Sequence, residues 1–358
     1  VGYEGAYYNW MSGKTTYDEF LKEVQHFETV NTDWFDILTS DAYSHTHTLS
    51  FSGGSEKIRY YTSFGLSNDD GVEKTSFSDR YTIMANLDAK LSDKFRAALR
   101  INANVLNKNH VPEEIGAMDY AYNTTRALPC YNEDGSYYYY KKYNDVSTGL
   151  NYNIMNEINN SLQAYNGNTS MVTLDLNYNV FDSWRLKATG SYTRSWTRQE
   201  DWWGENSWYA SSLRNAEPNQ TPPAGTAGNC YLPYGGILST RISDMESGML
   251  RVQSDFSKWV GGGEVHMIAS TLGFELNTSR NFSIFDEDRG YLKERGKQFV
   301  DMSTTGLDGE KLIDNYPFFK EWVARPHRTL SEDLGNTISG YLTLTYAYRD
   351  YFTLNANG

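Results

Sequence analysis

Polar and apolar residues alternate with a period of two through long stretches of this chain. The clearest case is the stretch 80–105, where every second position is apolar on either side of Ser92-Asp93. A period of two is typical of a β-strand, whereas a helix repeats every 3.6 residues. The pattern predicts two strands of about twelve residues joined by a two-residue turn, twice the usual length of about 5–6 residues. The apolar positions are Tyr81, Ile83, Ala85, Leu87, Ala89, Leu91, Phe95, Ala97, Leu99, Ile101, Ala103 and Val105.

The same alternation predicts ten strands in all, and their connections follow a rule. Short and long connections alternate strictly along the chain. The predicted strands are 48–53, 57–67, 80–91, 94–105, 171–181, 184–194, 249–259, 264–276, 340–348 and 351–357. The short connections are 53–56, 92–93, 182–183, 260–263 and 349–350, and the long ones are 68–79, 106–170, 195–248 and 277–339.

This rule places every short turn at one end of an antiparallel sheet and every long loop at the other. Short periplasmic turns, long extracellular loops and alternating strands of about ten residues are the organisation of a transmembrane β-barrel. A tilted strand needs about 9–11 residues to cross a ~30 Å hydrocarbon layer, which explains the strand length. We therefore predict an all-β chain forming part of a large antiparallel transmembrane barrel. Its apolar face would contact outer-membrane lipid, and Arg80, Asp88, Arg96 and Arg100 would face a wet lumen.

The aromatic residues next to the short turns support the prediction that the strands cross a membrane. An interfacial aromatic girdle is typical of barrels, although turn-flanking aromatics also occur in soluble sheets. These residues are Phe95, Phe181, Trp184, Trp259, Tyr351 and Phe352.

Residues 1–45 show no such alternation. Thr16 to Glu19 fits a helix capping box, and apolar residues follow it at helical spacing. A second short helix is predicted to start within residues 31–36. We expect an extracellular loop segment with short helices over 1–45 and a partial barrel over 46–358.

The net charge and the ends of the chain bear on its possible functions and on whether it is part of a longer protein. The 358 residues carry 45 acidic and 32 basic side chains, a net charge of −13, which argues against nucleic-acid binding. No run approaches the roughly 18 apolar residues of a membrane helix, and no signal peptide is visible. Because the chain lacks an initiator Met and stops within an alternating stretch, we expect it to be part of a longer protein.

Little in the sequence indicates bond-making or metal chemistry. No nucleophile elbow, phosphate loop or metalloprotease motif is found, so we expect no enzyme, no cofactor and no metal. His45 and His47 share one strand face but lack a further ligand. Cys130 and Cys230 both lie in predicted loops, where a disulfide and two free thiols are both compatible with the sequence.

Three segments of the chain resemble a known family. NTDWFDIL (31–38), SHTHTLSFSGGSEKIRYYTSFGLSNDDGVEK (44–74) and RYTIMANLDAKLSDKFRAALRINAN (80–104) resemble the SusC/RagA-type TonB-dependent transporters of Bacteroidetes outer membranes. HMIASTLGFELNTSRNFSIFDEDRGY (266–291) and GYLTLTYAYRDYFTLNANG (340–358) also resemble that family. Met84 departs from the polar residue expected in the NLDxKL hairpin. The resemblance covers most of the chain, with the loops least similar.

The resemblance implies a barrel of about 22 strands, with the plug domain and the C-terminal strands absent from this sequence. It implies active import of a nutrient, most often a glycan and otherwise a peptide. It also implies two protein partners: a SusD-like surface lipoprotein, and the TonB-ExbB-ExbD complex acting through the plug.

Aromatic and acidic residues in the loop at 195–248 are the candidate ligand contacts. Aromatic faces pack on sugar rings while neighbouring acceptors bind hydroxyl groups. The alternative is packing of the loop against itself or against the lipoprotein. The candidates are Asp201, Trp202, Trp203, Trp208 and Tyr209.

Two other classes of function stay open at this stage. One is a soluble secreted all-β carbohydrate-binding protein or glycosidase with aromatic loops. The other is a passive porin, which shares the physics of the barrel but needs no energised partner.

Overall fold

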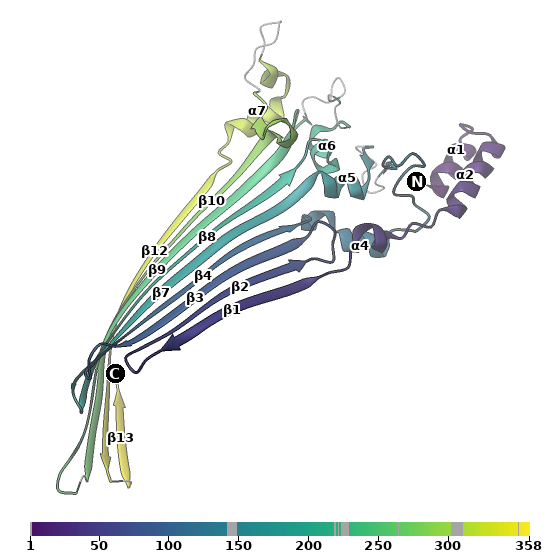
Figure 1. Cartoon of the computed structure of the whole chain (residues 1–358). Coiled ribbons are helices and arrows are strands. Elements are labelled where there is room, and N and C mark those ends of the chain that lie inside the picture. The colour runs from purple at the N-terminus through teal and green to yellow at the C-terminus, as the bar shows by residue number, and fades with distance from the viewer. Residues whose placement is uncertain are drawn as a thin grey trace.

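The computed structural model describes residues 2–141, 149–217, 220, 222, 229–263, 265–301, 311–349 and 351–358. It consists of one large antiparallel sheet with helices and loops gathered at one end (Figure 1). The strands follow one another in the order β1-β2-β3-β4-β7-β8-β9-β10-β12-β13, and the short β11 pairs with β10. The predicted all-β antiparallel architecture is confirmed. The strands are β1 Ser44–Gly54, β2 Ile58–Asp70, β3 Phe77–Lys90, β4 Phe95–His110, β7 Ser161–Phe181, β8 Trp184–Trp203, β9 Gly236–Val260, β10 His266–Leu292, β11 Gln298–Phe299, β12 Thr329–Tyr348 and β13 Phe352–Asn357.

Most of these strands extend well beyond the predicted boundaries. β9 has 25 residues and β10 has 27, and both grow toward the long loops. The predicted loop at 68–79 is wrong for half of its length, because β2 runs to Asp70 and β3 begins at Phe77. Beyond the membrane neither face needs to be apolar, so the alternation fades while the backbone ladder continues. Residues 264 and 350, at the edges of a predicted strand and a predicted turn, lie outside the described residues.

The strand register gathers the apolar positions on one face of the sheet. Leu87 of β3 lies opposite Leu99 of β4, which lies opposite Leu174 of β7. We call this the apolar face. Residues one position along each strand point to the opposite, polar face.

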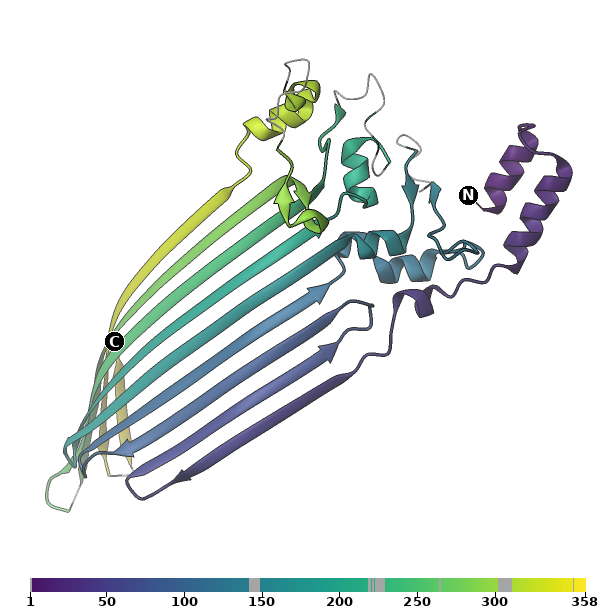
Figure 2. The ribbon, with the colours of Figure 1, turned by 45° about the horizontal axis from the view of Figure 1, so that its top comes forward.

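The short turns lie together at the end of the sheet away from the helices (Figure 2). In the turn between β3 and β4 the Ser92 hydroxyl accepts hydrogen bonds from the backbone N–H groups of Lys94 and Phe95, at 3.3 and 3.0 Å. In the turn after β9, Gly261 and Gly263 have φ values of 93° and 81°, which favour glycine. The turn geometry therefore agrees with the residue types that the sequence offers.

The N-terminal segment is helical, as expected. The capping box at Thr16 and Glu19 is present at the start of α2 (Tyr17–Thr29). The second predicted helix is α3 (Trp34–Leu38), which begins after the Asp33 cap. A third helix, α1 (Tyr3–Met11), has no side-chain cap and gave no sequence signal. α1 packs on α2 through stacked Trp10 and Phe20 rings, whose centroids lie 5.0 Å apart.

The remaining elements form a crown of loops over the far end of the sheet (Figures 1 and 2). Buried apolar residues concentrate there, because the sheet itself leaves both faces largely open. No helix among the described residues is long and apolar enough to cross a membrane. The crown contains the 3₁₀ turns Glu113–Ile115, Lys293–Arg295 and Leu312–Asn315, the helices α4 Ala117–Asn123, α5 Ile154–Asn159, α6 Trp208–Arg214 and α7 Pro317–Ala324, and the paired strands β5 Tyr140–Lys141 and β6 Asn151–Tyr152.

Candidate functional site

The polar face carries a row of ion pairs that crosses the sheet. Arg100 of β4 lies 2.5 Å from Asp175 of β7, and Lys187 of β8 lies 2.7 Å from Asp255 of β9. Arg251 of β9 continues the row at 2.5 Å from a carboxylate of β10. Because these pairs are partly exposed, each contributes about 0–1 kcal/mol to stability. Their main effect is to keep this face hydrated and charged.

Uncharged hydrogen-bonding groups link these pairs into a network. Thr189 donates to Asp175 at 2.8 Å, and Thr271 donates to Asp255 at 3.0 Å. The Tyr341 hydroxyl of β12 donates to the Gln253 amide oxygen at 2.8 Å. The polar face therefore offers both donors and acceptors from β4 to β12.

All four residues expected to face a lumen lie on this polar face. Arg80 and Asp88 occupy alternate positions of β3, and Arg96 and Arg100 do so on β4. Arg96 and Asp88 form a loose pair at 3.8 Å.

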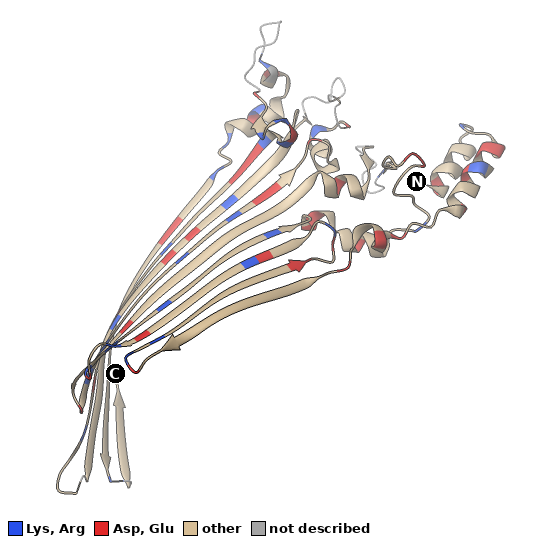
Figure 3. Ribbon diagram, viewed as in Figure 1, with Lys and Arg blue, Asp and Glu red and all other residues tan. Residues whose placement is uncertain are grey.

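At the end nearer the long loops, the apolar face carries charged side chains. Arg194 of β8 pairs with Asp244 of β9 at 2.8 Å and approaches Glu246 at 3.5 Å. One step along, Arg280 of β10 lies 2.6 Å from Glu332 of β12. Figure 3 shows acidic and basic residues distributed along the strands above their turn ends. These charges mark where the lipid-compatible part of the face stops.

The segment at 31–34 anchors the N-terminal region to the crown. Trp34 is 3% exposed, and its indole N–H donates to the Thr125 carbonyl at 3.1 Å. Thr32 donates to the Leu128 carbonyl at 2.6 Å, and Arg126 pairs with Asp33 at 2.9 Å. The Asp-Trp pair is therefore a structural anchor in this chain.

A buried carboxylate joins two loops of the crown. Glu157 of α5 is 2% exposed and accepts hydrogen bonds from the backbone N–H groups of Trp208 and Tyr209 at the start of α6. Ser207 caps the same helix by accepting from Ala210 at 3.0 Å. No sequence pattern singled out Glu157. The only local signal is Asn153, a good N-cap residue that begins α5.

The candidate ligand residues lie together at the top of β8 and the first turn of α6, but most of them are packed. Trp202 and Trp203 are each 8% exposed. Trp203 packs against Ala210, Leu232 and Ile237. The Trp208 and Tyr152 rings meet edge to face with centroids 6.0 Å apart.

Trp202 points to the opposite side of the strand from Trp203. Its ring lies under the Lys293 amine, 3.6 Å from the ring centroid. Asp201, on the side of Trp203, accepts hydrogen bonds from Gln163 at 2.7 Å and Gln199 at 3.1 Å. Tyr209 is the most accessible of the aromatic candidates, at 38% exposed, with its ring 4.6 Å from that of Trp203.

A hairpin turn in the crown precedes the four consecutive tyrosines at 137–140. Asn132 and Ser136 close the turn through a backbone hydrogen bond of 2.8 Å, with Gly135 at φ 82°. The Tyr120 and Tyr140 hydroxyls are 2.9 Å apart inside the crown. Burial raises the pKa of Tyr120, which keeps this hydroxyl neutral.

The two cysteines are free thiols in separate clusters. Cys130 packs in the cluster of Trp34, and Cys230 packs with Tyr316 and Phe319. Burial raises the pKa of the Cys130 thiol to about 11. The sequence was compatible with a disulfide or with two free thiols, and the structure has two free thiols. Among the described residues there is also no group of three or more potential metal ligands.

Comparisons with known proteins agree with this architecture. No protein-family model matches the chain. TonB-dependent receptor P26 of Formosa agariphila is 31% identical over 341 residues, which is 92% of this chain and 29% of that receptor. TonB-dependent receptor SusC of Bacteroides thetaiotaomicron is 32% identical over 110 residues, 30% of this chain and 11% of SusC. The chain thus spans less than a third of these curated relatives.

Solved structures match the fold over nearly the whole chain. The RagAB peptide importer in its closed-closed state aligns with a TM-score of 0.63 at 14% identity, covering 92% of this chain and 33% of that one. A second structure, of the RagAB peptide transporter, aligns with a TM-score of 0.64 over 91% of this chain and 32% of that one. The chain is therefore a homologue of the TonB-dependent receptors of the SusC/RagA type, and its long strands form a stretch of an outer-membrane β-barrel.

Proposed function

We propose that this chain is the barrel portion of a transporter that imports a nutrient across the outer membrane with energy from TonB. The observation that carries the proposal is the sequence identity to TonB-dependent receptors along 92% of the chain. The two faces of the sheet support it, because one suits lipid and the other suits water. A soluble protein would need to cover the long apolar face, and nothing among the described residues does so.

The substrate we propose is a glycan, delivered by a SusD-like surface lipoprotein. Aromatic rings and acidic acceptors at the top of β8 suit sugar rings and their hydroxyl groups. A peptide is the second candidate, because the similar RagAB protein is described as a peptide importer. We propose that TonB-ExbB-ExbD acts through a region outside this chain and that the chain breaks no bond in its substrate.

Within the barrel, Arg80, Asp88, Arg96 and Arg100 would line the lumen. Asp201, Trp202, Trp203, Trp208 and Tyr209 would border the extracellular entry. Trp203 and Trp208 pack against other residues of the crown, so we propose that they mainly hold the entry site in shape. Tyr209, the most accessible of the four rings, is the proposed direct contact.

The test uses the full-length protein in its native host. Deletion of the gene should abolish growth on one class of polymer, and dissipation of the proton gradient should stop uptake by the wild type. Uptake that continues without the gradient would indicate a passive porin and overturn the proposal. Loss of growth on peptides, with growth on glycans intact, would identify a peptide as the substrate in place of a glycan.

Tyr209→Ala tests the entry site. We expect weaker capture of the growth-supporting polymer, because the variant loses an aromatic face on which a sugar ring can pack; aromatic pairs, the nearest comparison, are worth about 0.5–1.5 kcal/mol. Tyr122→Ala is the matched control, because Tyr122 is an exposed tyrosine of α4 in the same crown. Equal effects of the two variants would remove Tyr209 from the proposed site.

A further inference from the structure

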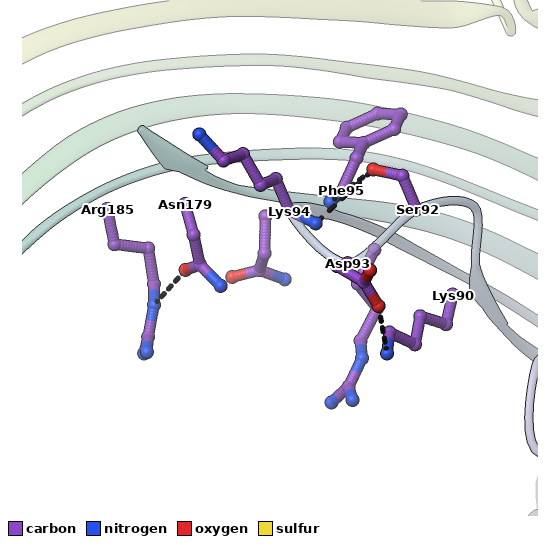
Figure 4. Close-up of a pocket in the computed structure, with 9 residues that line it drawn as sticks. Lys90, Ser92, Asp93, Lys94, Phe95, Asn179 and Arg185 are labelled. Carbon is purple, nitrogen blue, oxygen red and sulfur yellow. Dashed lines mark hydrogen bonds and ion pairs between the residues drawn. The ribbon is translucent and has the colours of Figure 1, made fainter. Parts of the chain in front are cut away.

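A basic pocket lies on the polar face at the turn end of the sheet, far from the crown (Figure 4). It has a volume of about 300 Å³ and is bordered by the turn residues 92–95 and by polar residues of β3, β4, β7 and β8. Four of its lining residues are cationic and one is acidic, in a chain whose net charge is −13. The cations are Lys90, Lys94, Arg96 and Arg185, and the acid is Asp93.

The strand register forces like charges together in this pocket. Lys90 of β3 lies directly opposite Arg96 of β4. Like charges directly opposite each other across a ladder are destabilising. The nearby acids only partly relieve this, since Asp93 pairs with Lys90 at 2.7 Å and Asp88 lies 3.8 Å from Arg96. A bound anion would remove the remaining repulsion.

Arg185 is held in place with its terminal nitrogens available. Its Nε donates to the Asn179 side-chain oxygen at 3.0 Å, the contact drawn in Figure 4. Its two terminal nitrogens have no partner among the residues that the structure describes. An arginine fork oriented in this way suits two oxygens of a carboxylate or phosphate. Asn177, which lies opposite Arg96, adds an amide donor to the same wall.

The backbone N–H groups of the turn are not available to bind a ligand. The N–H groups of Lys94 and Phe95 already donate to the Ser92 hydroxyl. The pocket therefore binds through side chains. The Lys94 amine points away and donates to the Val180 carbonyl at 3.3 Å, so beyond the Lys90–Asp93 pair the cations that face the space are Arg96 and Arg185. A phosphate group with up to two negative charges balances two arginines better than a single carboxylate does.

We infer that this pocket is a phosphate-binding site at the turn end of the barrel wall. Because the pocket opens on the polar face, which the lipid does not contact, the phosphate would come from aqueous solution, either as inorganic phosphate or as a phosphorylated small molecule. Both sources share the oxyanion that the two arginines recognise. The inference rests on the pocket's own charges and does not depend on the proposed import.

The experiment uses the full-length protein in nonionic detergent. Inorganic phosphate and a phosphate monoester, glycerol 3-phosphate, are each titrated calorimetrically. The variant R96Q/R185Q should lower the affinity for phosphate by at least about tenfold, the loss expected for charge-assisted hydrogen bonds. R185K, which keeps the charge but loses the fork, should have an affinity between those of the wild type and R96Q/R185Q.

R80Q is the matched control, because Arg80 lies on the same polar face near the other end of β3. Equal affinity for the two probes would identify inorganic phosphate as a sufficient ligand, and tighter binding of glycerol 3-phosphate would identify a phosphorylated small molecule. No binding of either probe by the wild type, or an equal loss in R80Q, would overturn the site. If R96Q/R185Q fails to assemble, R185K alone decides the matter.

Discussion

The carboxylate of Glu157 caps the helix that begins at Trp208, although 51 residues separate the two in sequence. It accepts from two successive backbone N–H groups whose helical partners do not exist. Because Glu157 is almost fully buried, these bonds replace water that it cannot reach. This single contact fixes the loop after β4 against the loop after β8.

Glu157→Gln should therefore loosen α6. The amide offers one acceptor oxygen in place of two, so the opening free energy of residues 208–214 should fall by about 1–3 kcal/mol. Hydrogen exchange of these amides measures it. Glu114→Gln, an exposed acid of the same crown, serves as control, and identical exchange in both variants would contradict the capping role.

Trp34→Ala should detach the N-terminal segment from the crown. Truncating a buried tryptophan typically costs 3–5 kcal/mol, here by emptying space beside Ala117, Ala121 and Leu128. Trp34→Phe keeps most of the packing and loses the hydrogen bond to Thr125, which costs about 1 kcal/mol. Proteolysis rates at residues 111–128 should rank the variants in that order. Wild-type rates in Trp34→Ala would exclude the anchor.

Adjacent lysine substitutions in β4 test the two faces of the sheet. Ile101 lies on the apolar face and Asn102 on the polar face. Ile101→Lys should cost about 2–4 kcal/mol of folding free energy in a bilayer, because its charge meets hydrocarbon. Asn102→Lys should cost close to nothing. Urea titration of the full-length protein in vesicles compares them, and a reversed order would mean that the faces are assigned the wrong way round.

Cys130 should react slowly with thiol reagents. With its pKa at about 11, its thiolate fraction at pH 8 is more than about 100-fold below that of an ordinary thiol of pKa about 8.5. Burial favours the neutral thiol, so its contribution to stability is complete below pH 8.5 and declines as the pH rises toward 11. Maleimide labelling checks this against Ser12→Cys, an exposed reference. Fast labelling of Cys130 in the folded protein would refute its burial.

The sequence predicted the strands wherever the two faces differ. Between Ile83 and Ile101 the lipid-facing and water-facing residues alternate cleanly, and the predicted hairpin is present. Near Asp69 and Ser78 both faces are polar, so the period of two carries no signal although the ladder continues. Strand ends beyond the membrane are fixed by backbone pairing, which no residue pattern reports.

The candidate residues were harder to place than the strands. Trp202 and Trp203 gave a clear aromatic signal, but their burial depends on loops far away in sequence, such as Leu232 and Lys293. Glu157 gave no signal, because a buried cap and a solvated glutamate look the same in sequence. The basic pocket depends on register, which places Lys90 opposite Arg96.

The length of β10 determines how far the crown stands from the cell surface. Its 27 residues span roughly 90 Å along the strand, and a tilt of 35–45° leaves a height of about 65–75 Å. The hydrocarbon layer takes up only about 30 Å of that height. The wall of the barrel therefore extends well beyond the lipid on its loop side. In the proposed transporter, a molecule that enters from outside would be enclosed by protein well before it reaches the plane of the bilayer.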